Sequence, residues 1–351
     1  MDDSTGAFIA ALRANAAQWQ ADGSPFYATL TRFIADDVGA GGPTWTVLSS
    51  HTNRPETELP VVRMLDAVHR IVLAGRAPAL TPHYPSTGGD GDAVAAWPLF
   101  CAVVTRNADE LRLALDHPPQ TNAVGRCAAI VGGLLQLAAE TRLPVRLLEI
   151  GASAGLLLRC DRYRYEAGHL GWGDPESPVR LLDCWVDRTP PLDAPLEIIE
   201  RRGCDQHPLD PTNEDDRLDL LSYVWPDETA RFELLRSALD LSARFPLVVE
   251  RAQIPEWLAA NVSPLPPGMV TVVMNSYVWQ YLDDQDAAAA RAALESAAAL
   301  ATTEAPLAHL SFEALDADYG NTQLRLTFWP GGNERLLALA TPHLGPVRWL
   351  A

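Results

Sequence analysis

Residues 145–158 read VRLLEIGASAGLLL, a short apolar segment followed by a turn of small residues and a second apolar segment. A strand, a glycine turn and a helix in this order open a βαβ unit. We therefore expect a strand over residues 145–150, a tight turn over residues 151–155, and a helix that starts near Leu156.

Further segments of alternating type follow this unit. Apolar runs predict strands, and segments with helical spacing lie between them. The expected strands are 196–199 continuing toward 204, 247–249, 269–274 and 308–312, and the expected helices are 215–223, 230–242, 255–261 and 284–302. Such alternation is typical of a parallel sheet that is covered on both faces.

The end of the chain has a different pattern. Residues 323–329 alternate with period two, Pro330-Gly331-Gly332-Asn333 is a turn cluster, and residues 335–340 read as a return strand. A C-terminal hairpin that places an antiparallel last strand in a parallel sheet is a feature of class I methyltransferases that use S-adenosylmethionine (SAM). We therefore predict an α/β fold with a Rossmann-like sheet of this class.

The part of the chain before the glycine turn reads as helices only. Apolar residues recur at helical spacing from Ala7 to about Arg142, and Pro/Gly-rich breaks separate the segments. We expect an all-helical region over residues 1–142, acting as lid and substrate region, and a SAM-binding domain over 143–351 with an insertion at about 166–195. The polar break at 86–91 is expected to be a mobile loop.

Composition excludes several classes of function. The chain has 351 residues, which allows about two domains, and 27 Lys+Arg against 45 Asp+Glu give a net charge of −18. This acidity argues against a protein that binds nucleic acid or an anionic membrane mainly by charge. Every basic residue other than histidine is arginine, so a P-loop and a pyridoxal Schiff base are excluded, because both need lysine.

Cysteines and histidines give no metal-binding pattern. The five cysteines are scattered, and the eight histidines form neither H-x-x-x-H nor H-E-x-x-H. We expect reduced thiols and no metal. The N-terminus lacks a signal-peptide pattern and no apolar run approaches the length of a membrane span, so we expect a cytoplasmic protein.

The glycine turn is the first candidate for a cofactor site. Glu149, Gly151, Ser153 and Gly155 form E-x-G-x-S-x-G, which is similar to the first motif of SAM-dependent methyltransferases. Small residues allow the backbone to approach the methionine part of SAM, and the acid can anchor its polar groups. The dinucleotide pattern G-x-G-x-x-G fits less well, because Ser153 stands where it needs glycine and Leu156 where it needs glycine or alanine. A tight turn without a ligand is the alternative.

Three further residues are candidates for holding SAM. Asp205 follows the second expected strand, where a carboxylate can accept both ribose hydroxyls; its alternative role is that of a turn or helix-cap acid. Gln253 stands where an acceptor for the adenine amine is expected. Arg126 is the candidate for the SAM carboxylate, with a surface ion pair as the alternative.

The strand expected at 269–274 ends in Asn275-Ser276-Tyr277-Val278, where this fold places acceptor-binding groups. Asn275 and Tyr277 are therefore our candidates for orienting a methyl acceptor. The segment differs from the Asn-Pro-Pro-Tyr signature of amino methyltransferases, so it names no acceptor. Residues 151–155 also match G-x-S-x-G, which makes a serine hydrolase with Ser153 as nucleophile a rival, although helices precede the turn where that fold needs strands.

Several segments together resemble an uncharacterised, mostly actinobacterial family, domain of unknown function 2332. They are residues 120–122, 125–126, 148–156, 161–163, 200–205, 211–212, 224–226 and 279–281. The resemblance covers nearly the whole chain and implies a methyltransferase-like fold without an established substrate. The chain departs from the family pattern at Ala123, Gln253 and Asn275.

We therefore expect a SAM-dependent methyltransferase that transfers the methyl group directly to a small molecule, with nucleic acid as the less favoured acceptor. A non-catalytic binding or scaffold protein with the same fold is the alternative, and the departures at Ala123, Gln253 and Asn275 favour it. A nicotinamide-dependent oxidoreductase is a third hypothesis, disfavoured by Ser153, Leu156 and the terminal hairpin.

Overall fold

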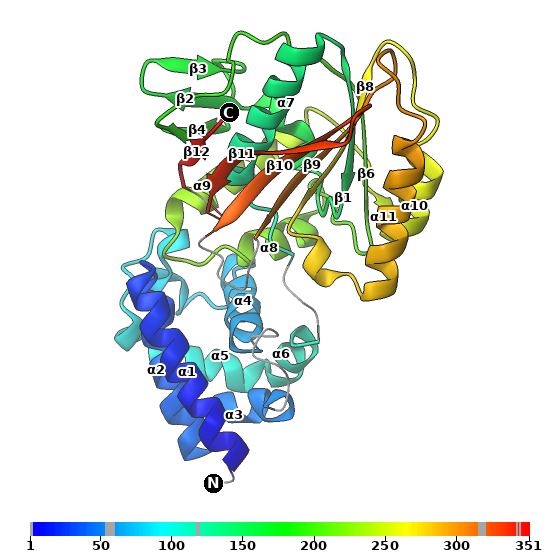
Figure 1. The fold of residues 1–351 in the computed structure, drawn as a ribbon. Coiled ribbons are helices and arrows are strands. Elements are labelled where there is room, and N and C mark those ends of the chain that lie inside the picture. The colour runs from blue at the N-terminus through cyan, green and yellow to red at the C-terminus, as the bar shows by residue number, and fades with distance from the viewer. Residues whose placement is uncertain (1–2, 53–59, 117–119, 315–320, 342, 344) are drawn as a thin grey trace. The chain divides into compact units, whose positions relative to one another are not determined.

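A computed structural model describes residues 3–52, 60–116, 120–314, 321–341, 343 and 345–351. The chain forms two compact units (Figure 1). Unit 1 comprises Met1–Thr121 and Glu214–Glu233, and unit 2 comprises Asn122–Asn213 and Leu234–Ala351. This division differs from the boundary expected near residue 142, because residues 122–142 belong to unit 2 and residues 214–233 return to unit 1.

The described part of unit 1 is helical, as predicted. Its α-helices are α1 (Asp3–Ala21), α2 (Pro25–Ala40), α3 (Pro43–Leu48), α4 (Pro60–Leu73), α5 (Ala93–Arg106), α6 (Ala108–Ala114), α8 (Glu214–Ser222) and the start of α9 (Thr229–Ser242). Short 3-10 helices are η1 (Ser49–His51), η3 (Thr81–His83) and η4 (Pro85–Thr87). The last two lie in or beside the segment that we expected to be a mobile loop.

Local signals explain where these helices begin and end. Pro25 occupies the first turn of α2, and Gly41 ends that helix in the left-handed conformation. Asp92 caps α5 by accepting hydrogen bonds of 3.0 Å from the N–H groups of Val94 and Ala95. On α4, apolar residues at helical spacing, such as Leu65 and Val72, are buried in the core of the unit.

Unit 2 contains a nine-stranded sheet in the order β5-β12-β11-β10-β9-β8-β1-β6-β7. The strands are β1 (Val145–Ile150), β5 (Trp185–Val186), β6 (Ile198–Asp205), β7 (Glu250–Arg251), β8 (Val270–Ser276), β9 (Leu307–Ala314), β10 (Thr322–Trp329), β11 (Asn333–Ala340) and β12 (Val347–Trp349). From β7 to β9 all neighbours are parallel, whereas β9, β10, β11 and β12 pair antiparallel. The expected α/β class and the C-terminal hairpin of β10 and β11 are therefore confirmed, although the sheet has three antiparallel pairs on this side.

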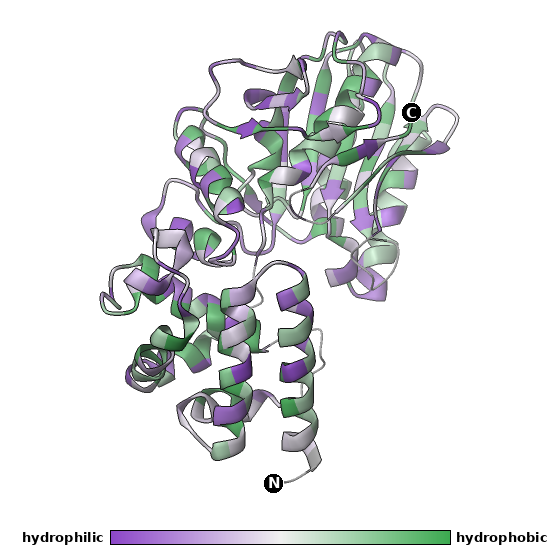
Figure 2. Ribbon diagram, turned by 90° about the vertical axis from the view of Figure 1, so that its left-hand side faces the viewer, coloured by the Kyte–Doolittle hydropathy of each residue, from purple (hydrophilic) through white to green (hydrophobic). Residues whose placement is uncertain are grey.

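Helices cover both faces of this sheet. Helix α7 (Cys127–Thr141) packs closely, because Cβ atoms at Gly132 and Gly133 would lie 2.7 Å from Trp349 and 2.6 Å from Leu310. Helices α10 (Ile254–Asn261) and α11 (Asp284–Ala298) share a buried cluster with residues such as Leu307. Leu310 lies against α7, whereas Leu307 belongs to the cluster with α10 and α11. The two leucines are three positions apart on β9, so their side chains point to opposite faces of the sheet, and the two helix layers lie on opposite faces. Figure 2 shows hydrophobic residues (green) both on strands of the sheet and on the helices.

Two predictions of secondary structure were wrong. The glycine turn leads into the 3-10 helix η6 (Leu157–Arg162) instead of an α-helix. Residues 152–160 are all buried, so this segment has no polar face that a surface helix could turn to solvent. The strand expected at 247–249 is also absent, and only the two residues of β7 pair with the sheet there.

A second, smaller sheet follows η6. It consists of β2 (Arg164–Ala167), β3 (Leu170–Trp172) and β4 (Arg180–Leu181) in the order β3-β2-β4. Together with β5 it occupies most of the insertion expected between the first two strands of the parallel sheet. No helix among the described residues is long and apolar enough to cross a lipid bilayer.

Candidate functional site

The chain reverses its direction of travel across the sheet at β1. From β1 it moves to β6 and β7 on one side, and then to β8 and β9 on the other. In open α/β sheets, ligands bind at the carboxyl ends of the strands at this switch point. Ile150 pairs with Cys204 on β6 and with Asn275 on β8. The residues that follow these three positions therefore meet at the carboxyl ends of the three strands. The site residues expected on β1, β6 and β8 are thereby brought together.

Asp205 lies directly beside the glycine turn. Its Oδ2 accepts the Ser153 N–H at 2.9 Å and its Oδ1 accepts the His207 N–H at 2.8 Å. The side chain is partly exposed, and each carboxylate oxygen can accept more than one hydrogen bond. Asp205 therefore holds the turn and also retains acceptor capacity toward a ligand.

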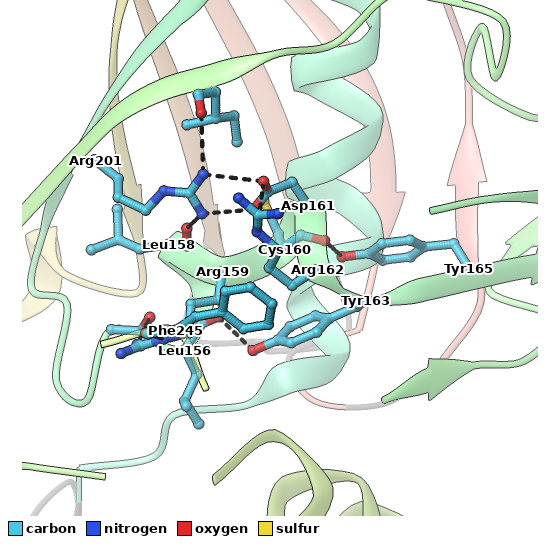
Figure 3. A network of polar contacts seen from close by, with 12 residues as sticks. Leu156, Leu158, Arg159, Cys160, Asp161, Arg162, Tyr163, Tyr165, Arg201 and Phe245 are labelled. Carbon is cyan, nitrogen blue, oxygen red and sulfur yellow. Dashed lines mark hydrogen bonds and ion pairs between the residues drawn. The ribbon is translucent and has the colours of Figure 1, made fainter. Parts of the chain in front are cut away.

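The segment after the turn is stabilised by side chains, because a short 3-10 helix leaves carbonyl groups without partners. The hydroxyls of Tyr163 and Tyr165 donate to the carbonyls of Leu156 and Cys160, both at 2.7 Å (Figure 3). Arg201 on β6 donates to the Leu158 carbonyl at 3.2 Å.

The same arginine also forms a two-pronged ion pair with Asp161, with distances of 2.8 and 3.1 Å (Figure 3). This pair ties η6 to β6.

Arg159 holds the turn itself. This arginine is 1% exposed, and its guanidinium donates to the carbonyls of Gly155 at 2.8 Å, Ala154 at 3.3 Å and Phe245 at 3.0 Å. Burial lowers the pKa of Arg159. Because carbonyl groups take up its donors, the charged side chain orders the backbone of the turn.

Tight packing alone explains why glycine stands at two positions near the turn, and neither position needs a ligand to explain it. Gly151 has φ +68°, and a Cβ atom there would lie 2.4 Å from Cγ2 of Val278. A Cβ at Gly203 on β6 would lie 2.9 Å from side-chain carbons of Ala152 and Leu158. The small residues of the turn are therefore required by the contacts of β1 with both neighbouring strands.

Backbone strain also lies at this edge. Ser153 and Tyr277 have φ of +49° and +57°, which side-chain-bearing residues rarely adopt. They follow β1 and β8 respectively, at the switch point. Strained residues of this kind cost about 1–3 kcal/mol each and are concentrated at functional sites.

Two buried acceptor atoms beside the turn have no hydrogen-bond partner among the described residues. They are Oε2 of Glu149, which is 1% exposed, and Oδ1 of Asn122, which is 8% exposed. The Nδ2 of Asn122 donates to the Ala152 carbonyl at 3.3 Å, so the amide points its oxygen elsewhere. Burial, and then the nearby Asp205, raise the pKa of Glu149 well above its usual range. Buried polar groups are as a rule hydrogen-bonded, so both atoms indicate a place for a polar group of a ligand.

On the other side of the switch point, Asn275 is fully engaged by protein groups. Its Nδ2 donates to Ser311 at 3.2 Å and to Glu313 at 2.6 Å. Its Oδ1 accepts the Nε2–H of His309 at 2.7 Å. Asn275 is 1% exposed. Asn275 is therefore buried at the carboxyl end of β8, where its side chain positions Ser311, Glu313 and His309.

Glu313 is a candidate site residue that the sequence interpretation missed. It ends β9, is partly exposed, and its Oε1 also accepts the Val278 N–H at 2.9 Å. Burial raises its pKa. The period-two alternation of His309, Ser311 and Glu313 on β9 was a signal that these side chains share one face, but only the pairing of β8 with β9 brings them to Asn275.

The remaining candidates lie as follows. Arg126 is 7% exposed, its guanidinium lies 4.5 Å from the ring centroid of Tyr277, and its Nη1 donates to Ser276 Oγ at 3.2 Å. The Tyr277 hydroxyl is hydrogen-bonded to Thr322 on β10. Gln253 is exposed at the start of α10, and its Oε1 accepts from Gln206 at 2.8 Å. Arg126 and Tyr277 thus belong to the β8 side, and Gln253 to the β6 side.

All five cysteines are free thiols, and burial raises the pKa of Cys204 to about 12. In the described part of the chain, no group of three or more His, Cys, Asp or Glu residues could hold a metal ion.

Residues 10–349 match the family described as "Uncharacterized protein conserved in bacteria (DUF2332)". The chain belongs to this family. No curated protein and no solved structure matches the chain. Segments that carried the resemblance, such as 161–163 and 200–205, meet around the glycine turn through the Asp161–Arg201 pair and Asp205.

Proposed function

We propose that this DUF2332 protein is a SAM-dependent methyltransferase that acts on a small molecule, with SAM at the carboxyl ends of β1 and β6. The single observation that carries the proposal is the partly exposed Asp205 carboxylate beside the glycine turn, 2.9 Å from the Ser153 N–H. A carboxylate next to a small-residue turn suits a ribose whose two hydroxyls need acceptors.

The chemistry of the other groups fits SAM. Glu149 Oε2 and Asn122 Oδ1 have no hydrogen-bond partner among the described residues. The ammonium group of the methionine part would bring three N–H donors to them, and its positive charge would favour the ionised, accepting form of Glu149. Arg126 is the candidate for the carboxylate, and the exposed Gln253 amide is the candidate for the adenine amine. A dinucleotide fits less well, because no α-helix N-terminus follows the turn to face a pyrophosphate.

When bound, SAM would supply a methyl group on a positively charged sulfur. The chain would bind it along the β1 and β6 edge and orient the acceptor from the β8 and β9 side. Glu313 has a raised pKa and Oε1 fixed by Asn275 and Val278, so its carboxylate suits accepting a proton from the acceptor. Arg159 and Asp205 would keep the turn rigid, so that positioning supplies most of the rate.

Calorimetric titration of the full chain with SAM and with S-adenosylhomocysteine tests the cofactor. We expect micromolar binding, weakened at least tenfold in Asp205→Asn. The matched control is Asp174→Asn, since Asp174 also accepts the N–H of the residue two positions on, at 2.9 Å, but lies between β3 and β4. Gly151→Arg is less suitable, because Val278 packs against Gly151 and the variant would disturb the turn itself.

Folded protein that binds neither ligand would contradict the proposal, and binding of NADH instead would favour the oxidoreductase hypothesis. Equal affinity of Asp205→Asn and wild type would remove Asp205 from the site.

The engagement of Asn275 favours a second function, a binding protein without catalysis. Among the described residues, the side-chain amide of Asn275 donates to Ser311 and Glu313 and accepts from His309, so protein groups hold both of its ends. Incubation with SAM and a bacterial small-molecule extract separates the two functions. Formation of S-adenosylhomocysteine that is lost in Glu313→Gln supports the enzyme, whereas binding without turnover supports the binding protein.

A further inference from the structure

Unit 1 contains a serine and a histidine in the arrangement of a nucleophile and its base. The Oγ of Ser86 lies 2.8 Å from Nε2 of His69, and Nδ1 of His69 lies 3.1 Å from the carbonyl oxygen of Ser222. A carbonyl only accepts, so Nδ1 carries the ring proton and Nε2 accepts from the Ser86 hydroxyl. A nucleophile, a base within hydrogen-bond reach and a group that orients the base are the parts that nucleophilic catalysis requires.

The base is enclosed and neutral. His69 is fully buried on α4, where its ring stacks on Tyr84 at 5.5 Å between centroids and packs on Phe232 at 6.1 Å. This burial lowers the pKa of His69 to about 4. The ring is therefore neutral at pH 7, and its Nε2 lone pair accepts the Ser86 hydroxyl at 2.8 Å.

The loop that presents the serine is tightly built. Ser86 lies in η4 and is partly exposed. The next residue, Thr87, donates through Oγ1 to the carbonyls of Thr81 and Tyr84, both at 2.8 Å. A Cβ at Gly89 would lie 2.5 Å from the Pro82 carbonyl oxygen, so the loop folds back on itself where only glycine fits. These contacts hold Ser86 above His69.

Tyr84, which stacks on His69, and Asp66, which lies near Tyr84, each carry a buried oxygen atom that indicates a place for a polar ligand. The hydroxyl of Tyr84 and Oδ1 of Asp66 have no hydrogen-bond partner in the described chain, and both side chains are at most 3% exposed. Tyr84 stacks on His69, and Asp66 lies close enough to Tyr84 to raise its pKa, after burial itself. Such groups are normally satisfied, so a polar group of a bound molecule suits this place.

We propose that Ser86 is a nucleophile for ester substrates, with His69 as its base and the Ser222 carbonyl as the group that orients the base. Ser86 Oγ bonds to the ester carbonyl carbon while its proton passes to His69 Nε2. The bond to the alkoxy group then breaks, and that group takes the proton from Nε2. Water, deprotonated by His69, releases the acid from Ser86 and restores the hydroxyl. The activity is independent of the methyltransferase proposal.

The chain offers a matched control within the same unit. Ser50 Oγ lies 2.8 Å from Nδ1 of His51, but the two residues are adjacent in sequence, and His51 lies 3.4 Å from Asp116. A hydrogen bond between neighbours in the chain is the ordinary local pattern of a serine. Ser50→Ala therefore removes a serine–histidine contact without touching Ser86.

The test is reaction of the full chain with a biotinylated fluorophosphonate, with the labelled residue located by peptide mass spectrometry, together with hydrolysis of p-nitrophenyl acetate. We expect label on Ser86, loss of label and hydrolysis in Ser86→Ala, at least tenfold slower labelling in His69→Gln, and no change in Ser50→Ala. Circular dichroism shows that each variant is folded.

Labelling of Ser50, no labelling beyond that of heat-denatured protein, or hydrolysis unchanged in folded Ser86→Ala would each overturn the proposal. Ser86→Cys covers the case in which Ser86→Ala is unstable. Its thiol should react with iodoacetamide at least tenfold faster than that of the double variant Ser86→Cys/His69→Gln, and equal rates would also overturn the proposal.

Discussion

The two units each contain a histidine whose pKa is lowered to about 4 by burial, His69 in unit 1 and His309 in unit 2. Their rings are used in opposite ways. His69 donates from Nδ1 to the Ser222 carbonyl and accepts at Nε2 from Ser86. His309 donates from Nε2 to the oxygen of Asn275. Burial sets the charge of both rings, and the neighbouring atom decides which nitrogen carries the proton.

This difference has a functional consequence. In unit 1 the histidine offers a lone pair to a hydroxyl, which is what a base requires. In unit 2 the histidine fixes the orientation of an amide, and the proposed function assigns the role of base to Glu313 instead. Two histidines with similarly lowered pKa values therefore differ in what they contact, a hydroxyl that the ring can deprotonate in unit 1 and an amide oxygen that it orients in unit 2.

We expect the largest loss of stability from His69→Phe. The variant leaves the buried Ser222 carbonyl without its His69 donor and removes the acceptor of the partly exposed Ser86 hydroxyl, so we expect unit 1 to lose roughly 3 kcal/mol of stability. Hydrogen exchange of α4 peptides at pH 7.5, read by mass spectrometry, measures it. The matched control is His83→Phe in the neighbouring loop, where His83 contacts the exposed Asp90, and a comparable loss there would break the comparison.

The next effect is a dependence on pH. The pKa of His69 falls from 6.5 to about 4 on folding, so the unfolded chain binds the proton first as pH drops. The contribution of the neutral His69 to the free energy of unfolding is therefore fully present above pH 6.5. It declines as the pH falls toward 4, by up to about 3 kcal/mol. Asp66 works the other way, because burial raises its pKa and its protonated form is favoured at low pH.

Comparison of wild type with His69→Phe at pH 7.5 and pH 4.5 removes the contribution of Asp66, which both share. We expect the stability difference between the two proteins to shrink as pH falls, again by hydrogen exchange in α4. A difference that is constant with pH would show that His69 is not held neutral by burial.

A smaller effect is expected for His309→Leu in unit 2. His309 gives one hydrogen bond and is partly exposed, so its loss should cost about 1–2 kcal/mol and free Asn275 Oδ1. Exchange in peptides of β8 and β9 measures it. A loss as large as that of His69→Phe would mean that the two histidines are equivalent structural residues after all.

The smallest effect should follow Ser311→Ala. Asn275 keeps the shorter bond of 2.6 Å to Glu313 when the 3.2 Å bond to Ser311 is removed, so we expect a loss of about 0.5 kcal/mol. The same exchange measurement applies. A loss above that of His309→Leu would place the main support of Asn275 at Ser311 instead of His309.

Much of the fold follows from local patterns. The first strand was expected at residues 145–150 and is β1, and the period-two segment at 323–329 forms β10 of the hairpin. Both rest on side-chain periodicity, which neighbouring residues carry by themselves. The helix expected after the turn was wrong, because Leu156–Cys160 are buried on all sides and their carbonyls are satisfied by Tyr163, Tyr165 and Arg201 from elsewhere.

The candidate sites also contain residues that the sequence could place and residues that it could not. Asp205 could be placed beside the glycine turn because parallel neighbours end at a common edge. Glu313 and the Ser86–His69 pair could not, because no motif spaces these residues and their meeting depends on how strands and helices pack.

The amino-acid sequence by itself determined the helical region, the strand and turn at 145–155, the C-terminal hairpin and the family. Periodicity and glycine content act over a few residues, so they can be read without knowing the packing. Only the tertiary structure decided which buried groups are satisfied and which nitrogen of each histidine is protonated. A hydrogen bond between Ser86 and His69, or between His309 and Asn275, joins separate elements, and its atoms meet only after those elements have packed.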